Sequence, residues 1–198
     1  MDPPFEGGFG AMSLDAMTKP TEIETPRLRL VALTPELAQM QVEKPIDFFE
    51  ALGVAPEPSW PPEFMDHAAM KWAAGQLAAH PSDTGWYAWV YVSPVLNRLL
   101  GAGGFRGRAQ ASGEVEIEYS MLLSYREQGL ATEGVRALMD WAYGDPSVQR
   151  IVARTPLDRN ASHRVLEKSG FTQSKQETDP DTGIDMIYWS HERLEQAA

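Results

Sequence analysis

One stretch of the sequence, residues 114–143, constrains the fold more than any other. Residues 114–123 alternate polar and apolar side chains as a half-buried strand does. After a short turn that contains Gly129, apolar residues recur with helical spacing at Ala131, Val135, Leu138, Met139 and Ala142. The first amides of a helix have no acceptor within the helix, and the helix dipole places positive potential there. The turn is therefore a candidate binding site for a phosphate group.

The residue types in this turn suit a phosphate group. Gly129 lets a ligand approach the backbone closely, and Ala131 keeps the next turn small. Arg126 can add a cation, and Thr132 can donate a hydroxyl. Glu133 does not suit an anion site unless its carboxylate points away and favours the positive end of the helix. A plain strand–turn–helix with a satisfied N-terminus is the alternative interpretation.

The composition is that of a single globular domain and argues against several classes of function. The 198 residues are 43% hydrophobic and 23% charged, and no apolar run approaches the length of a bilayer span. The chain has no cysteine and four scattered histidines, so we expect no metal site. The net charge of −11 argues against nucleic-acid and membrane partners, and is compatible with an amine as partner. Without cysteine or a signal peptide, we expect a cytoplasmic protein.

The order of elements is expected to be one strand, two helices, three strands, a helix, a strand, a helix and two strands. The expected strands are 24–31, 86–92, 99–106, 114–123, 149–155, 171–175 and 184–190. The expected helices are 34–42, 62–80, the one that ends before Gly144, and 161–169. Residues 45–62 contain five prolines and are expected to hold no continuous element. Residues 1–18 are interpreted as a flexible leader, from cloning or an upstream start, before one domain at 19–198.

This order of elements resembles the GNAT N-acetyltransferases, and local stretches resemble the RimJ/RimL-like branch of that family. The spacing Arg126-x-x-Gly129-x-Ala131 is similar to the diphosphate loop of the family. The other similar stretches are residues 24–30, 60–63, 115–120 and 164–171, and the resemblance covers about residues 22–195. It implies an α/β (α+β) fold whose mixed, mostly antiparallel sheet is flanked by helices and splayed between its fourth and fifth strands.

The resemblance also implies acetyl-CoA as co-substrate and an amine as acceptor. The pantetheine arm would lie between the strands 114–123 and 149–155, bound to the main chain of Met121, Leu122 and Leu123. Asn160 would reach the same arm, although it falls one residue late and Arg159 occupies the register of the family's asparagine. The diphosphate would lie on the turn, at Arg126, Gln128, Gly129, Leu130, Ala131 and Thr132.

Transfer to an amine needs a group that takes the amine's proton and a means of stabilising the oxyanion. Glu114, Glu116 and Glu118 share one face of their strand. The resemblance favours Glu116 as the base. It favours Glu118, where the family often carries glycine, as a contact to the acceptor. A solvated polar face is the alternative for each glutamate.

A second group must donate a proton to the CoA thiolate as it leaves. Many GNAT enzymes use a tyrosine on the last helix, and Leu166 occupies that position here. The RimJ/RimL-like branch uses a serine near the start of this helix, and Ser162 lies in its register. An ordinary helix N-cap is the alternative role for Ser162.

The leading hypothesis is an N-acetyltransferase that joins acetyl-CoA and a primary amine in a ternary complex, as a monomer or a homodimer. The acceptor would be a protein N-terminal α-amine or a small-molecule amine. The rival is a catalytically idle acyl-CoA-binding sensor, which the missing tyrosine and the displaced asparagine would support. A nucleotide-binding module of another fold would need a Walker-type lysine loop, which the sequence lacks.

Overall fold

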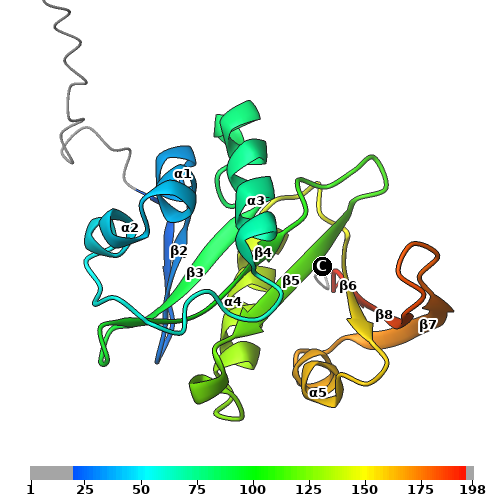
Figure 1. The fold of residues 1–198 in the computed structure, drawn as a ribbon. Coiled ribbons are helices and arrows are strands. Elements are labelled where there is room, and N and C mark those ends of the chain that lie inside the picture. Colours follow the sequence, from blue (N-terminus) through cyan, green and yellow to red (C-terminus); the bar gives the residue numbers. More distant parts are fainter. Residues whose placement is uncertain (1–19, 195–198) are drawn as a thin grey trace, which may run out of the picture.

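An eight-stranded sheet runs through the computed structural model, which describes residues 20–194 (Figure 1). Its strands are β1 (Glu22–Glu24), β2 (Arg29–Ala32), β3 (Ala88–Ser93), β4 (Arg98–Phe105), β5 (Glu114–Met121), β6 (Arg150–Pro156), β7 (Thr172–Thr178) and β8 (Asp185–Glu192). They lie in the order β1-β2-β3-β4-β5-β6-β8-β7. Among the strand pairs of the described residues, β5–β6 alone is parallel. The mixed, mostly antiparallel sheet expected from the sequence is confirmed.

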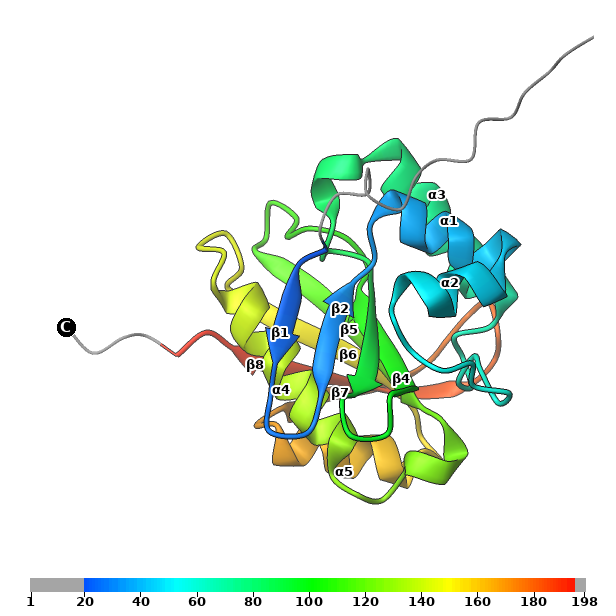
Figure 2. The ribbon, with the colours of Figure 1, turned by 90° about the vertical axis from the view of Figure 1, so that its left-hand side faces the viewer.

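Helices cover both faces of this sheet. They are α1 (Pro35–Glu43), α2 (Pro45–Ala51), α3 (His67–Ala79), α4 (Leu130–Tyr143) and α5 (Asn160–Lys168). Two 3₁₀ turns, η2 (Pro81–Asp83) and η3 (Leu123–Tyr125), add to them. Helices α1 to α3 lie on one face, and α4 and α5 lie on the other (Figure 2). In the described part of the chain, no helix is long and apolar enough to span a bilayer.

Helix α4 is fixed to the sheet by aromatic packing. Its Trp141 ring lies 4.7 Å from Trp86, 5.3 Å from Trp89 and 5.9 Å from Phe105, measured between ring centroids. Such aromatic contacts stabilise a core beyond their buried area. The predicted apolar face is confirmed, with Ala131 half-buried and the rest buried, namely Val135, Leu138, Met139 and Ala142. The turn before α4 is therefore attached to a rigid element.

The sheet is splayed at its centre. β5 and β6 pair only at Glu114–Arg150, Val115–Ile151 and Glu116–Val152. Beyond these pairs, β5 continues beside β4 to Met121, and β6 continues beside β8 to Pro156. The two strands therefore diverge towards their C-terminal ends. This confirms the expected splay, which falls between the fifth and sixth strands because β1 was not foreseen.

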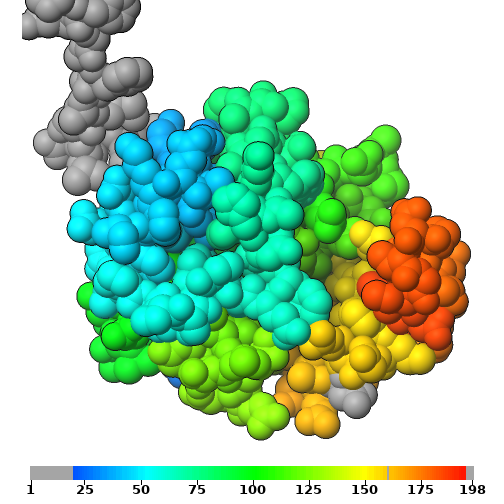
Figure 3. Space-filling view, in the orientation of Figure 1, coloured from blue at the N-terminus to red at the C-terminus, as the bar shows by residue number. Residues whose placement is uncertain are grey.

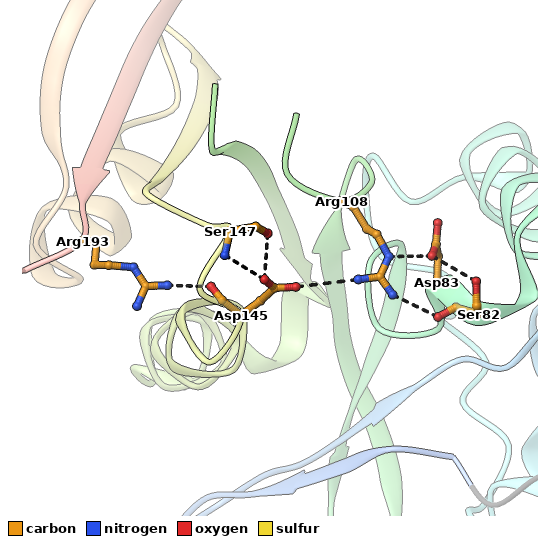
Figure 4. A network of polar contacts seen from close by, with 6 residues as sticks. All are labelled: Ser82, Asp83, Arg108, Asp145, Ser147 and Arg193. Atoms are coloured by element: carbon orange, nitrogen blue, oxygen red, sulfur yellow. Dashed lines mark hydrogen bonds and ion pairs between the residues drawn. The ribbon is translucent and has the colours of Figure 1, made fainter. Parts of the chain in front are cut away.

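A polar network holds the closed end of this splay (Figure 4). The Arg108 guanidinium lies 2.6 Å from the Asp83 carboxylate and 3.7 Å from that of Asp145. Arg193, which follows β8, donates to the Asp145 carbonyl at 2.6 Å. These contacts join the connections that enter β3, β5 and β6. They lie at the opposite end of β5 from the turn before α4.

The structure corrects two boundaries near the start of the chain. Residues 45–51 form α2, because Pro45 occupies the first helical position and Phe48 and Phe49 are buried. Helix α3 begins at His67 rather than near residue 62, because the Asp66 carboxylate caps it and accepts from the Ala69 amide at 2.9 Å. The other predicted helices and strands are present within a few residues. The predicted leader, residues 1–18, lies outside the described residues.

Candidate active site

The turn between β5 and α4 leaves its amides without acceptors. Gly129 is the N-cap of α4, with a left-handed φ of 77° and no side-chain cap. Within the described residues, the amides of 127–132 donate to no acceptor, whereas the next amide, of Glu133, donates to the Gly129 carbonyl at 3.1 Å. Residues 127–129 are exposed to solvent. Free amides and the positive end of a helix dipole are thus presented together, which is an anion-binding arrangement.

The Glu133 carboxylate points away from these free amides, as an anion-binding role for the turn requires. Its carboxylate accepts hydrogen bonds from the Thr25 hydroxyl at 2.7 Å, the Arg27 amide at 2.8 Å and Arg27 Nε at 2.7 Å. Burial alone would raise the pKa of Glu133, but these donors outweigh it and hold the pKa below its usual range. Arg27 also donates to the Gln128 carbonyl at 2.8 Å. The segment before β2 therefore supports the turn, a role that sequence reasoning missed.

The residues expected to hold the pantetheine arm line the C-terminal end of β5. The Met121 carbonyl accepts from Arg126 Nε at 3.0 Å, and the Leu122 amide donates to the Leu100 carbonyl at 2.9 Å. The Leu123 amide donates to no acceptor among the described residues, and the Leu123 side chain is 76% exposed. Of the three main-chain segments, the one at Leu123 is therefore the most available to a ligand.

Two glutamates of β5 differ in their surroundings. Glu116 belongs to the last residue pair that joins β5 to β6. Its carboxylate accepts hydrogen bonds from Arg154 Nε at 2.8 Å and from Arg154 Nη2 at 3.2 Å. Glu118 lies where the two strands have parted, and its charge partner is Arg106 at 3.4 Å. Partial burial raises the pKa of Glu118, and the nearby Glu116 charge adds to this, while Arg106 and Arg154 oppose it. Glu118 is thus the less neutralised carboxylate and the closer one to the open gap.

A hydrogen bond crosses the splay from β5 to α5. The Tyr119 hydroxyl donates to the Ser162 carbonyl at 3.0 Å. Burial raises the pKa of Tyr119, so its hydroxyl stays protonated as a donor at neutral pH. Ser162 is in the first turn of α5, whose N-cap is Arg159, so the alternative role of Ser162 as N-cap is wrong. Asn160 is the first residue of α5, and Leu166 is fully buried in the core.

Arg126 and Arg159 face the splay from opposite walls and share one carboxylate. Arg126 Nη2 lies 3.0 Å from Glu63 Oε2, and Arg159 Nη2 lies 3.2 Å from Glu63 Oε1. The Arg159 guanidinium also lies 4.5 Å from the centre of the Phe64 ring. Local sequence pattern could not reveal this cluster, because its members come from three distant segments. In the described part of the chain, no group of three or more histidine, aspartate or glutamate side chains is placed so that it could bind a metal ion.

Residues 27–172 match the family described as Acetyltransferase (GNAT) domain. This match spans well over half of the chain, and the chain therefore belongs to the GNAT acetyltransferase family. A Bacillus subtilis (strain 168) protein described as uncharacterized N-acetyltransferase YjdG is 29% identical over 150 residues, which are 75% of this chain and 88% of that protein. The family and this relative identify the chain as an acetyltransferase.

Solved structures share the fold at low sequence identity. The ribosomal-protein-S5-alanine acetyltransferase from Vibrio fischeri has a TM-score of 0.64 at 15% identity, over 90% of this chain and 100% of that one. The ribosomal L7/L12 α-N-protein acetyltransferase RimL, solved with coenzyme A, has a TM-score of 0.62 at 18% identity. That comparison covers 87% of this chain and 98% of RimL. At such identities the likeness establishes the fold alone.

Proposed function

We propose that the protein transfers an acetyl group from acetyl-CoA to a primary amine by direct attack in a ternary complex. The observation that carries the proposal is the row of acceptor-free amides at 127–132 beside the open end of the splay. A diphosphate bound by Gln128, Gly129, Leu130, Ala131 and Thr132 would satisfy these amides. Among the described residues these amides have no internal acceptor to lose, so a diphosphate could bind them without breaking a main-chain hydrogen bond.

The splay would hold the pantetheine arm of acetyl-CoA. The edge of β5 beyond Glu116 and the edge of β6 beyond Val152 are not paired with each other, so an extended arm could bind there as an added strand does. Leu123 would contribute its free amide, while Met121 and Leu122 would line the passage. Fixing the thioester beside an amine makes their reaction effectively intramolecular.

We assign the role of base to Glu118 rather than to Glu116. Both oxygens of Glu116 are already engaged by Arg154, and Glu116 lies at the closed end of the splay. Glu118 lies beside the open gap with one charge partner at 3.4 Å, and would take the proton of the attacking amine directly or through water. Glu116 would then keep Arg154 in place and leave the acceptor contact to Glu118.

Ser162 would give a proton to the departing thiolate. Its backbone is held by the Tyr119 hydroxyl, which fixes the first turn of α5 relative to β5. The position at which many GNAT enzymes carry the acidic tyrosine holds Leu166, which is buried in the core and has no proton to give. This arrangement favours the serine-dependent chemistry of the RimJ/RimL-like branch.

The acceptor would be a cationic amine, either a protein N-terminal α-amine or a small molecule. Support comes from Glu116 and Glu118 on one face of β5 and from the net charge of −11. Both features favour approach of a positive substrate, which then loses its proton to the base. The protein would act as a monomer or a homodimer.

The test is release of free thiol from acetyl-CoA, measured with a thiol reagent while a panel of polyamines, small amines and N-terminal peptides is offered. The proposal predicts acceptor-dependent release and an acetylated amine detected by mass spectrometry. Binding of acetyl-CoA without release for any acceptor would favour the idle sensor, for which the buried Leu166 is the supporting observation. No binding of acetyl-CoA would contradict both proposals.

A further inference from the structure

We propose that the Glu63 carboxylate is a built-in competitor of the cofactor's phosphate groups, and that cofactor binding releases the segment before α3 from the mouth of the splay. This inference rests on the proposed use of acetyl-CoA and adds Arg159 to the cofactor-binding residues. One carboxylate bridges two guanidinium groups that stand on opposite walls of the splay. A phosphate group offers those guanidiniums the same charge and the same paired acceptor oxygens.

Arg126 is the first of the two cations that Glu63 binds. It precedes the acceptor-free amides of 127–132, where an anion would need a cation. Its Nη2 is bound to Glu63 at 3.0 Å, and its Nε donates to the Met121 carbonyl at 3.0 Å. The Glu63 carboxylate therefore forms an ion pair with the same guanidinium group, that of Arg126, that the diphosphate would bind.

Arg159 is the second cation that Glu63 binds. It is the N-cap residue of α5, across the splay from Arg126, and its Nη2 lies 3.2 Å from the other oxygen of Glu63. The two arginines hold the pKa of Glu63 below its usual range. The carboxylate is thus a full anion between two cations at neutral pH. A ligand phosphate that enters between these arginines has to replace it.

The segment that carries Glu63 is held in place by the same contacts. Figure 3 shows the chain that leads into α3 meeting the chain that leads into α5. Phe64, next to Glu63, has a φ of 68°, a left-handed conformation that is strained for a bulky residue. Phe64 is 61% exposed, and the Arg159 guanidinium lies over its ring, 4.5 Å from the ring centre. Loss of the contacts to Arg159 would remove what stabilises this conformation, so the segment would relax when a phosphate takes over the arginine.

The exposure of the cluster makes the exchange feasible. The side chains of Glu63, Arg126 and Arg159 are 44%, 32% and 37% exposed, so the ion pairs are weak enough to be exchanged. A competitor of this kind weakens cofactor binding in the wild-type protein and couples binding to movement of the segment 60–66. The coupling is equal in both directions, because it is a free energy shared by the two events.

The test compares binding of CoA and of pantetheine, which lacks the phosphates, by isothermal titration calorimetry. We expect Glu63→Gln to tighten the Kd for CoA about three- to tenfold, the range for release from two exposed ion pairs, and to leave pantetheine unchanged. Arg159→Gln should weaken CoA binding by a similar factor and reduce the effect of Glu63→Gln in the double variant. Glu57→Gln is the matched control, because Glu57 lies in the same connection and pairs with Arg98 at 3.4 Å.

Hydrogen exchange of the wild-type protein gives a readout that needs no variant. We expect CoA to raise the exchange rate of amides in 63–66 while it protects the amides of 127–132. An unchanged Kd for CoA in Glu63→Gln, an equal change for pantetheine, or protection of 63–66 by CoA would overturn the inference. Failure of the wild-type protein to bind CoA would instead contradict the proposed function itself, so the two failures are distinguishable.

Discussion

Arg27 and Glu133, 106 residues apart in the sequence, form an ion pair that supports the turn before α4. Arg27 Nε lies 2.7 Å from Glu133 Oε2, while Arg27 Nη1 donates to the Gln128 carbonyl at 2.8 Å. One guanidinium thus joins the first turn of the helix to the loop that precedes it. The acceptor-free amides of 127–132 are held by a contact outside the proposed ligand site.

Removal of this support should weaken cofactor binding. Glu133→Gln leaves the side-chain shape but takes away the charge that holds Arg27, and loss of hydrogen bonds to a charged group costs about 1–3 kcal/mol. Part of that cost should appear as an approximately tenfold weaker Kd for CoA, measured by calorimetry. Glu50→Gln, in an exposed glutamate of α2, is the matched control and should change nothing. An unchanged Kd in Glu133→Gln would show that the turn does not depend on this support.

The same ion pair should make folding stability depend on pH. The pKa of Glu133 is depressed in the folded protein, so its contribution is fully present above the unfolded pKa of about 4.3 and is lost as pH falls through the folded pKa. We expect wild type to exceed Glu133→Gln in free energy of unfolding at pH 7, and the difference to shrink below about pH 4. Urea unfolding at several pH values measures it. A difference that stays constant or grows in acid would contradict the sign.

The two glutamates of β5 should differ in their effect on turnover. Glu118→Gln should lower kcat about 100-fold or more, as loss of a general base does, with little change in the Kd for CoA. Glu116→Gln should have a smaller effect, because Glu116 already forms a bidentate pair with Arg154. Steady-state kinetics with the best acceptor measures both variants. If Glu116→Gln proves the more damaging variant, the assignment favoured by the resemblance is right and ours is wrong.

Arg106 should influence the pH at which kcat/KM falls on the acidic side of its pH profile. A base must be deprotonated to act, so kcat/KM should rise with pH through the raised pKa of Glu118. The Arg106 charge, 3.4 Å away, opposes that rise in pKa. Arg106→Gln should therefore move the acidic limb to higher pH, which a profile of kcat/KM against pH would reveal. A limb that stays in place or moves to lower pH would argue against Glu118 as the titrating group.

Much of the fold could be predicted because it is encoded locally. The strand–turn–helix at 114–143 follows from its change of apolar period, and the structure places Gly129 of this turn at the N-cap of α4. The splay itself came from resemblance to a family rather than from spacing. α2 was not predicted, because five prolines in 45–62 argue against a continuous element; Pro45, however, stands at the first helical position, where a missing N–H breaks no helical hydrogen bond.

The tertiary contacts of the site could not be predicted in this way. The pair of Arg27 with Glu133 and the bridge from Glu63 to Arg126 and Arg159 join residues that no periodicity relates. Ion pairs of this kind depend on how the elements are arranged in space. The different surroundings of Glu116 and Glu118 also depend on where β5 and β6 part, which only the three-dimensional structure shows.

The most direct test of the account is an amide chemical-shift titration of the ¹⁵N-labelled protein with CoA and, separately, with pantetheine. Because the amides of 127–132 have no acceptor among the described residues, a diphosphate should bind them first. We predict large shifts for Gln128 to Thr132 with CoA and small shifts there with pantetheine. Equal shifts with both ligands, or no shift in this turn on saturation with CoA, would contradict the claim that these amides bind the diphosphate.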